Sequence, residues 1–411
     1  LITASDKDTY SLVYINIKHF KYLTEQIGSE KSDQIVKSIF DIIENQLKPN
    51  ELVSHVFADR YIVLLKEFDD EERLINLSNS IKTSIDTNGI IEINVTQGVY
   101  KINSKSTTIN AAADRAHVAQ LAVKDVYGSD GINFFDETWL KNDAEIVDIE
   151  QRQDVALKEN QLHVFYQLKR NIFKDNWCGS EALIRWIDPI KGMISPGKFI
   201  PLFEKNGFVI KLDLFVFENV CKNISRMIDD GITPLRVSVN VSRSHLMHKN
   251  FLDEYFKLME KYNVPPKYIE FELTESLVME NSEILVEIIN QIHKFGCTCS
   301  IDDFGSGYSS LNMLKEFDFD VIKLDQVFFR GSNGFDDKAK KIVHSVIELC
   351  HTLNKTIVAE GVENKEIVNY LKKEKCAIIQ GYYFSKPVPY EDYMTQVKKQ
   401  SEEEKNKIND K

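Results

Sequence analysis

Two adjacent aspartates, Asp302 and Asp303, close a strand-like run and precede the glycine- and serine-rich stretch at 305–310. Polar residues close similar short apolar runs throughout the second half of the chain, and each is followed by a helical stretch. In chain order, these strand-end residues are Glu181, Asn240, Glu272, Asp302, Lys323, Glu360 and Gln380. Any one of them alone is more often a turn or cap residue than a ligand. Seven at successive strand ends predict one shared site.

Oxygen donors dominate this set, and they predict bound metal ions. Five carboxylates and one amide at one mouth would repel each other without cations, and an all-oxygen set without His or Cys selects Mg²⁺ or Mn²⁺. Asp302 and Asp303 together can serve two ions, and two-metal sites stabilise the attacking and leaving oxygens of phosphodiester cleavage. Lys323 is suited to orient the water, and Gln380 to hydrogen-bond substrate or water. The expected metal ligands are Glu181, Asn240, Glu272, Asp302, Asp303 and Glu360.

The spacing of these strand ends predicts the fold that positions them. A strand, a helix and their loops need about 30 residues, whereas 59 residues separate Glu181 from Asn240. This gap predicts one more strand that does not end in a polar residue, with the apolar stretch at 198–203 as the candidate. Seven or eight strand–helix units predict an eightfold β/α barrel with its active site at the C-terminal strand ends.

The first third of the chain has a different pattern. Strand-like runs at 11–17, 52–65 and 90–101 alternate with helical patterns at 29–47 and 109–124. The order β-α-β-β-α-β predicts a compact α+β domain.

Between the two patterns lies a polar stretch at 136–160 that contains periodic Leu, Ile and Val but no Gly or Pro, and it predicts a helical connector. We therefore expect domains at 1–135 and 161–400, joined by this connector.

Composition narrows the class of protein. A length of 411 residues favours two domains, and a net charge of −12 argues against a general nucleic-acid-binding surface. The six cysteines form no CxxC pair, which favours reduced thiols in a cytoplasmic protein. No apolar run is long enough to span a membrane. The chain starts at Leu1 without a methionine, so we allow for a longer protein in which a membrane or sensor segment precedes it.

Taken together, the motifs closely resemble the EAL family of cyclic-di-GMP phosphodiesterases. Glu181-Ala182-Leu183 is the signature triplet, and the resemblance covers about 155–395. The other motifs follow in family order: SPGKFIPLFEKNG (195–207), SVNVS (238–242), FELTES (271–276), DDFGSGYSSL (302–311), IKLD (322–325), AEGVE (359–363) and QGYYFSKP (380–387).

The resemblance implies that a barrel with two Mg²⁺ or Mn²⁺ ions linearises cyclic di-GMP (c-di-GMP) to pGpG. By position, Glu181, Asn240, Glu272 and Asp302 would bind the first metal, and Asp302, Asp303 and Glu360 the second. Lys323 would help to activate the water, with Gln380 and Glu363 in support.

The resemblance also implies roles outside the metal shell. Arg185 and Gln167 would contact substrate, and Glu275 would anchor the loop at 305–310, which links the metal site to a homodimer contact. Two positions depart from the family pattern: Leu168 stands where proline is usual, and His245 where glutamine is common. We expect these departures to tune substrate affinity.

The N-terminal part resembles a GGDEF domain, the cyclase fold that often precedes EAL, with eroded motifs. The signature falls on 57–61, where both glycines are lost and Arg60 replaces a metal-binding acid. Asn16 replaces the first-strand aspartate, and the product-inhibition motif becomes the stretch at 48–51. We therefore expect no cyclase activity. A folded spacer or dimerisation module and a nucleotide-sensing domain that binds GTP both stay open.

For the barrel, the alternative to an active phosphodiesterase is a non-catalytic c-di-GMP receptor. Receptors of that kind generally lose one or more metal ligands, and here every ligand position is kept. The sequence therefore favours hydrolysis.

Overall fold

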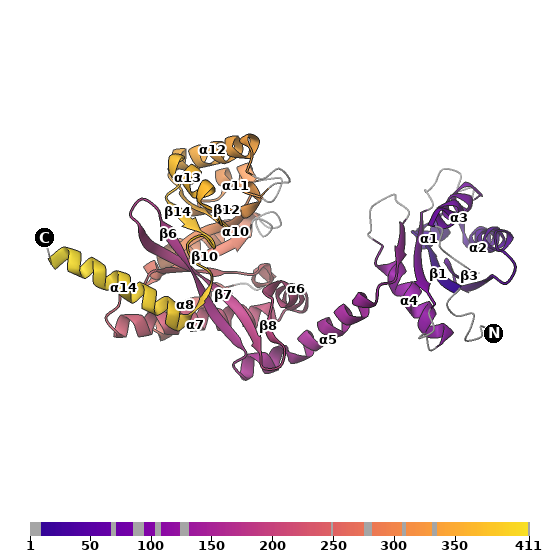
Figure 1. The fold of residues 1–411 in the computed structure, drawn as a ribbon, viewed down its shortest axis with the longest axis horizontal. Coiled ribbons are helices and arrows are strands. Elements are labelled where there is room, and N and C mark those ends of the chain that lie inside the picture. Colours follow the sequence, from indigo (N-terminus) through magenta and orange to yellow (C-terminus); the bar gives the residue numbers. More distant parts are fainter. Residues whose placement is uncertain are drawn as a thin grey trace. The chain divides into compact units, whose positions relative to one another are not determined.

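A computed structural model describes residues 10–66, 71–84, 94–102, 108–123, 131–247, 250–274, 282–305, 310–330 and 335–409. The chain divides into two compact units, Leu1–Glu145 (the N-terminal unit) and Ile146–Lys411 (the barrel unit). Figure 1 shows a sheet with helices in each. Helix α5 (Glu137–Lys158) occupies nearly all of the stretch in which the sequence predicts a helical connector. Among the described residues, no helix is long and apolar enough to cross a membrane.

The N-terminal unit is a five-stranded sheet of order β2-β3-β1-β4-β5 with helices on both faces. All neighbouring strands pair antiparallel except β4 and β5. Its strands are β1 (Tyr10–Ile17), β2 (Leu52–Phe57), β3 (Arg60–Lys66), β4 (Val95–Lys101) and β5 (Gly131–Phe134). Its helices are α1 (Phe20–Ile27), α2 (Ser29–Asn45), α3 (Glu71–Ser84) and α4 (Ile109–Leu121). The predicted α+β domain is confirmed.

Central strand β1 shows why this sheet has two covered faces. Val13 and Ile15 belong to one buried cluster with α1, α2 and α3, whereas Leu12 and Tyr14 pack with α4 on the other face. Alternate side chains of a strand point to opposite faces, so an apolar run buries both.

The barrel unit closes through the strand order β6-β14-β13-β12-β11-β10-β9-β7, with β7 pairing back to β6. The eightfold β/α barrel is confirmed, and Figure 1 shows helices around its strands. The strands are β6 (Leu162–Asn171), β7 (Asn176–Asp188), β9 (Arg236–Asn240), β10 (Ile269–Thr274), β11 (Thr298–Phe304), β12 (Val321–Leu324), β13 (Thr356–Ala359) and β14 (Ile378–Gln380).

First strand β6 departs from a regular barrel, because it runs antiparallel to both of its neighbours, β7 and β14. A short turn joins β6 to β7, in which Asn171 Oδ1 accepts from the backbone N–H groups of Phe173 and Lys174. A hairpin of this kind needs no crossover helix.

The expectation of a strand near 198–203 was wrong. This stretch lies in helix α6 (Pro196–Asn206), because Phe199 and Phe203 are spaced four apart and are both fully buried against Trp186. The missing eighth strand is β6, upstream of Glu181. The 59-residue gap instead holds β8 (Gly192–Ile194), α6 and the long helix α7 (Val209–Asp229).

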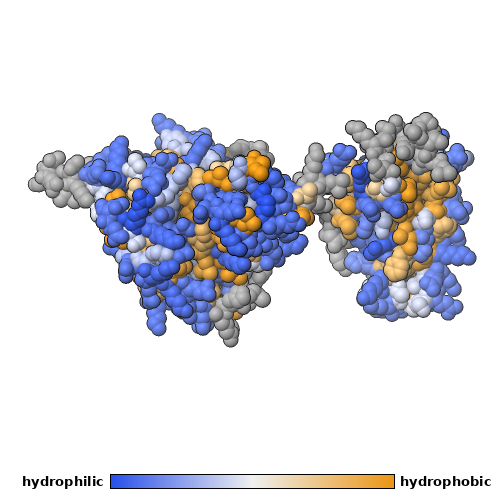
Figure 2. All heavy atoms as spheres, turned by 90° about the horizontal axis from the view of Figure 1, so that it is seen from below, coloured by the Kyte–Doolittle hydropathy of each residue, from blue (hydrophilic) through white to orange (hydrophobic). Residues whose placement is uncertain are grey.

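Further elements cover the barrel and its edge. These are α8 (Leu252–Lys261), α10 (Ser282–Phe295), α11 (Ser310–Glu316), α12 (Asp337–Thr352), α13 (Lys365–Lys373), α14 (Tyr390–Asn409), β15 (Val388–Pro389) and the 3₁₀ turns η2 (Arg243–Met247), η3 (Pro266–Tyr268) and η4 (Gln326–Phe328). In Figure 2, the visible face of the barrel unit is largely hydrophilic with a hydrophobic band, and that of the N-terminal unit carries a broader hydrophobic area.

Candidate active site

All seven strand-end residues of the sequence prediction lie in one interaction network at the C-terminal ends of the parallel strands. Glu272 on β10 pairs in register with Asn240 on β9, and Asp302 on β11 pairs with Thr274. Asn240 Nδ2 donates to Glu181 Oε1 over 3.1 Å, which ties β9 to β7. Parallel strands of a closed barrel bring their carboxyl ends to one mouth, which is why distant sequence positions meet here.

Lys323 on β12 is the centre of this network and is completely buried. Its Nζ lies 2.8 Å from Glu360 Oε1, 2.9 Å from Glu272 Oε1, 3.0 Å from Asp302 Oδ1 and 3.7 Å from Glu181 Oε2. Burial lowers the pKa of Lys323, but the four carboxylates raise it by more, and the pKa lies well above its usual value. Lys323 is therefore an ammonium ion at neutral pH.

A second buried lysine lies beneath the first. Lys169 Nζ on β6 contacts Ser238 Oγ at 2.9 Å, Glu272 Oε1 at 3.2 Å and Glu270 Oε1 at 3.4 Å. Burial raises the pKa of Glu272, but Lys323 and Lys169 outweigh it and lower this pKa to about 2. Glu272 is thus held ionised between two cations. The sequence analysis missed Lys169, although its spacing of two from Gln167 places both on one strand face.

The paired aspartates differ in surroundings because β11 is irregular at this point. Its register against β12 shifts between Ile301 and Phe304, and Asp303 adopts a left-handed backbone with φ of 55°. This bulge interrupts the alternation that would send adjacent side chains to opposite faces. Asp302 contacts Lys323, and Asp303 lines the pocket. Burial and the neighbouring Asp302 raise the pKa of Asp303 to about 7.

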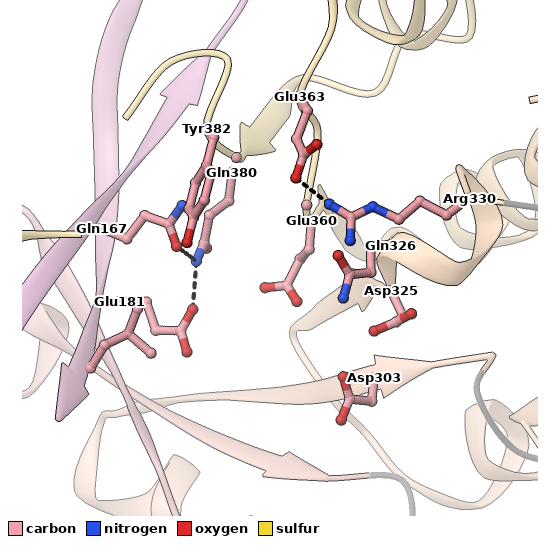
Figure 3. Close-up of a pocket in the computed structure, with 13 residues that line it drawn as sticks. Gln167, Glu181, Asp303, Asp325, Gln326, Arg330, Glu360, Glu363, Gln380 and Tyr382 are labelled. Atoms are coloured by element: carbon pink, nitrogen blue, oxygen red, sulfur yellow. Dashed lines mark hydrogen bonds and ion pairs between the residues drawn. The ribbon is translucent and has the colours of Figure 1, made fainter. Parts of the chain in front are cut away.

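Three members of the network, Glu181, Glu360 and Gln380, line a cavity of about 470 Å³ (Figure 3). Gln380 Nε2 donates to Glu181 Oε2 over 2.5 Å and to Gln167 Oε1 over 3.2 Å, so two of the predicted substrate-binding or supporting residues meet the metal-ligand set here. Burial raises the pKa of both Glu181 and Glu360. Five carboxylates line the cavity: Glu181, Asp303, Asp325, Glu360 and Glu363.

The donor chemistry of this site fits a hard divalent cation. Two buried oxygens, Glu272 Oε2 and Gln380 Oε1, have no hydrogen-bond partner within the described part of the chain, and they lie among carboxylates. Within the described ranges, no three acidic, His or Cys side chains stand together as a ready-made metal site, because the carboxylates close on Lys323 instead. The site thus offers suitable oxygen donors for a divalent ion without a preformed cage.

Comparison with known proteins assigns the barrel unit. A family model described as "EAL domain" matches residues 150–387, more than half of the chain. The chain belongs to the EAL domain family. A second model, "Diguanylate cyclase, GGDEF domain", matches residues 2–126. The predicted resemblance to both families is confirmed.

Individual relatives of this EAL protein share its two-part organisation or its barrel. It is 28% identical to the cyclic di-GMP phosphodiesterase NbdA of Pseudomonas aeruginosa and 28% identical to the cyclic di-GMP phosphodiesterase PdeR of Escherichia coli, over 92% and 94% of the chain. The chain spans 49% and 59% of the lengths of these two relatives.

Solved structures resemble the barrel of this EAL protein as well. The phosphodiesterase PaMucR in complex with c-di-GMP superposes with a TM-score of 0.57 at 32% identity, over 60% of this chain and 99% of that one. An EAL domain protein from Listeria monocytogenes gives a TM-score of 0.53 at 26% identity, over 60% and 96% of the two chains.

Several predicted site residues do not line the cavity. Glu272, Asp302, Lys323 and Asn240 lie in the network without lining it. Arg185 does not line it: its Nη1 donates to the Ile184 carbonyl, and its side chain belongs to a second cavity of about 290 Å³. Asn240 also lines that second cavity, and Leu183 borders both. Glu275, and positions 306–309 of the loop that it is expected to anchor, lie outside the described residues.

His245, one of the two departures from the family pattern, is buried and does not line the cavity. Its Nε2 lies 3.1 Å from Asp213 Oδ2 and 3.0 Å from the Tyr255 hydroxyl, and Asp213 also accepts from the Ser242 backbone N–H. Ser242 follows Asn240 by two residues, so this network fixes the turn after a predicted metal ligand.

The GGDEF signature lies on the turn between β2 and β3 in the N-terminal unit. Ala58 takes a left-handed conformation with φ of 47°, the conformation that glycine adopts at least cost. Asn16 and Arg60, which the sequence analysis expects at the metal-binding positions of a GGDEF domain, are paired in register on β1 and β3. An amide and a cation therefore stand side by side at this point of the sheet.

Proposed function

We propose that the EAL domain hydrolyses c-di-GMP to linear pGpG with two Mg²⁺ or Mn²⁺ ions. The observation that carries this proposal is the ring of Glu181, Glu272, Asp302 and Glu360 around Lys323 at the barrel mouth. Relatives named as c-di-GMP phosphodiesterases, and a related phosphodiesterase in complex with c-di-GMP, support the substrate.

The metal ligands would be Glu181, Asn240, Glu272, Asp302, Asp303 and Glu360. Bound divalent ions would lower the pKa of the attacking water and stabilise charge on the phosphate oxygens. Glu272 is suited to this role because Lys169 and Lys323 hold it ionised. Asp303 is suited because the bulge turns it into the cavity beside Glu360.

Residues around these ligands would bind the substrate, orient the attacking water and position the metal ligands. Lys323 supplies a fixed positive charge and a donor that orients the attacking water, and Gln380 holds Glu181 in place. Gln167, Glu363 and Arg185 would contact substrate. We assign Glu275 to the anchoring of the loop at 305–310, so Glu275→Ala should lose most activity and wild-type kinetics would remove this assignment.

For the N-terminal unit, we propose a regulatory role without cyclase activity. In a cyclase, two carboxylates would hold the magnesium ion of a nucleoside triphosphate, and Asn16 beside Arg60 cannot replace them. GTP bound to one conformer of this unit would shift the activity of the barrel. Deletion of 1–135 or addition of GTP should then change the hydrolysis rate. Identical kinetics for the whole chain, the whole chain with GTP and the chain without 1–135 would favour the alternative that this unit is a spacer or dimerisation module.

We further propose that the protein works as a homodimer through its EAL domain. Analytical ultracentrifugation of the whole chain and of the barrel alone should give dimers in both cases. A monomeric, fully active barrel would contradict this assignment.

The test of hydrolysis is incubation with c-di-GMP and Mg²⁺, followed by chromatographic separation of c-di-GMP from pGpG. Ca²⁺ in place of Mg²⁺ should stop turnover, because Ca²⁺ prefers longer bonds and more ligands. Binding without turnover in Mg²⁺ would favour the alternative, a non-catalytic receptor. Equal turnover with both ions would contradict a two-magnesium site.

A further inference from the structure

Arg330 is the only cationic side chain among the described residues that line the active-site cavity, which carries five carboxylates. Lys323 is completely buried and does not line the cavity, and four carboxylates already surround it. A substrate with two phosphates enters a mouth whose lining is strongly negative. Arg330 is therefore the lining group that can attract it.

The backbone around Arg330 is held in place. Arg330 follows the 3₁₀ turn η4, and its N–H donates to the Gln326 carbonyl over 3.0 Å. Gly361 has a φ of 61°, and a Cβ at this position would lie 2.5 Å from Gln326 Cβ, so η4 packs directly on the segment that carries Glu360 and Glu363. The position of Arg330 relative to the metal-ligand carboxylates is thus set by close backbone packing.

The Arg330 side chain forms an ion pair with Glu363 at the edge of the cavity (Figure 3). The two side chains are 53% and 51% exposed. An ion pair exposed to this extent contributes little to stability, because water competes for both charges. Arg330 can therefore exchange Glu363 for another anion at small cost.

We propose that Arg330 is a specificity-determining residue. On substrate binding, Arg330 releases Glu363 and its guanidinium binds the phosphate of the cyclic dinucleotide that is not cleaved. This inference rests on the proposed hydrolysis of c-di-GMP. A guanidinium presents parallel N–H groups that match two phosphate oxygens, which a lysine ammonium cannot do. Glu363, once released, is free to accept from the substrate, as its predicted role requires.

The test compares two substrates in steady-state kinetics. For Arg330→Gln, the KM for c-di-GMP should rise about tenfold or more, since a charge-assisted contact is lost, while kcat stays within about twofold. Hydrolysis of bis(4-nitrophenyl) phosphate, a diester with a single phosphate, should not change. Arg330→Lys should give an intermediate KM, because charge is kept without the bidentate geometry.

The matched control is Arg170→Gln. Arg170 also pairs with an exposed acid, Asp175, but it lies on the β6–β7 hairpin and does not line the cavity. This variant should keep the wild-type KM for both substrates. Equal KM increases in the two arginine variants, or parallel losses on both substrates for Arg330→Gln, would overturn the inference.

Equilibrium binding of c-di-GMP in Ca²⁺ separates this inference from the proposed function. Arg330→Gln should weaken binding about tenfold whether or not the wild type turns over. A wild type that makes no pGpG in Mg²⁺ contradicts the proposed function alone. A wild type that makes pGpG, combined with an Arg330→Gln variant of unchanged KM and affinity, contradicts the role of Arg330 alone.

Discussion

The two units of this chain resemble two families of nucleotide-handling domains, and they differ in the charged side chains that lie at the predicted site. At the barrel mouth, four carboxylates surround Lys323, and Lys169 supports Glu272 from below. On the N-terminal sheet, Asn16 and Arg60 stand side by side at the positions where the sequence predicts that two acids have been lost. Each arrangement is electrostatically self-consistent, but only the first keeps the anionic donors that a divalent ion needs. The N-terminal sheet thus forms with an amide and a cation at these two positions.

The largest effect should follow removal of a metal-ligand carboxylate in the barrel. Glu181→Ala removes a charged ligand that also accepts from Asn240 and Gln380, and turnover should fall about a thousandfold. Asn16→Ala, at the corresponding kind of position in the N-terminal unit, should leave turnover within about twofold. A Glu181→Ala enzyme with more than a tenth of wild-type activity would show that the assigned site is wrong.

The next effect concerns stability of the barrel. Lys169→Met leaves Glu270 and Glu272 buried with one counter-charge fewer, and the free energy of unfolding should fall by about 3 kcal/mol. Lys191→Met breaks an exposed pair with Asp148 in the same unit and should cost less than about 1 kcal/mol. Urea denaturation of both variants provides the comparison. Equal losses would mean that Lys169 does not offset the buried carboxylates.

The smallest effect should be confined to the N-terminal unit. A Cβ at Gly98 would lie 2.0 Å from the Ala116 carbonyl oxygen, so Gly98→Ala should push α4 from β4 and cost about 2 kcal/mol. At Gly197 in α6, the nearest atom would be 3.8 Å away, and Gly197→Ala should cost nothing. Hydrogen exchange resolved by mass spectrometry should show faster exchange in β4 for the first variant only. Faster exchange throughout the barrel would contradict an effect confined to the N-terminal unit.

The sequence was enough to predict the strand-end residues of the barrel, because each polar residue interrupts an apolar strand at its end. It was not enough to place β6, because a hairpin strand that runs against its neighbours has the same apolar pattern as a parallel one. The stretch at 198–203 was assigned as a strand because a short apolar run has no decisive period, and its phenylalanines proved to have helical spacing.

Contacts across the barrel were the least predictable part of the site. Lys169 meets Glu272 across 103 sequence positions, and Arg330 meets Glu363 across 33. Neither pair forms a local motif: Lys169 on β6 reaches Glu272 on β10 inside the barrel, and Arg330 and Glu363 follow the neighbouring strands β12 and β13. The bulge at Asp303 is likewise a property of the pairing between β11 and β12 and not of the two aspartates themselves.

The central claim is that the barrel breaks a cyclic dinucleotide while the N-terminal unit makes none. Its most direct test is incubation of the whole chain in Mg²⁺ with GTP in one reaction and c-di-GMP in another, with all guanine nucleotides separated by anion-exchange chromatography. We predict that c-di-GMP is converted to pGpG and that GTP yields neither c-di-GMP nor pGpG. Unchanged c-di-GMP, or any c-di-GMP or pGpG made from GTP, would contradict the claim.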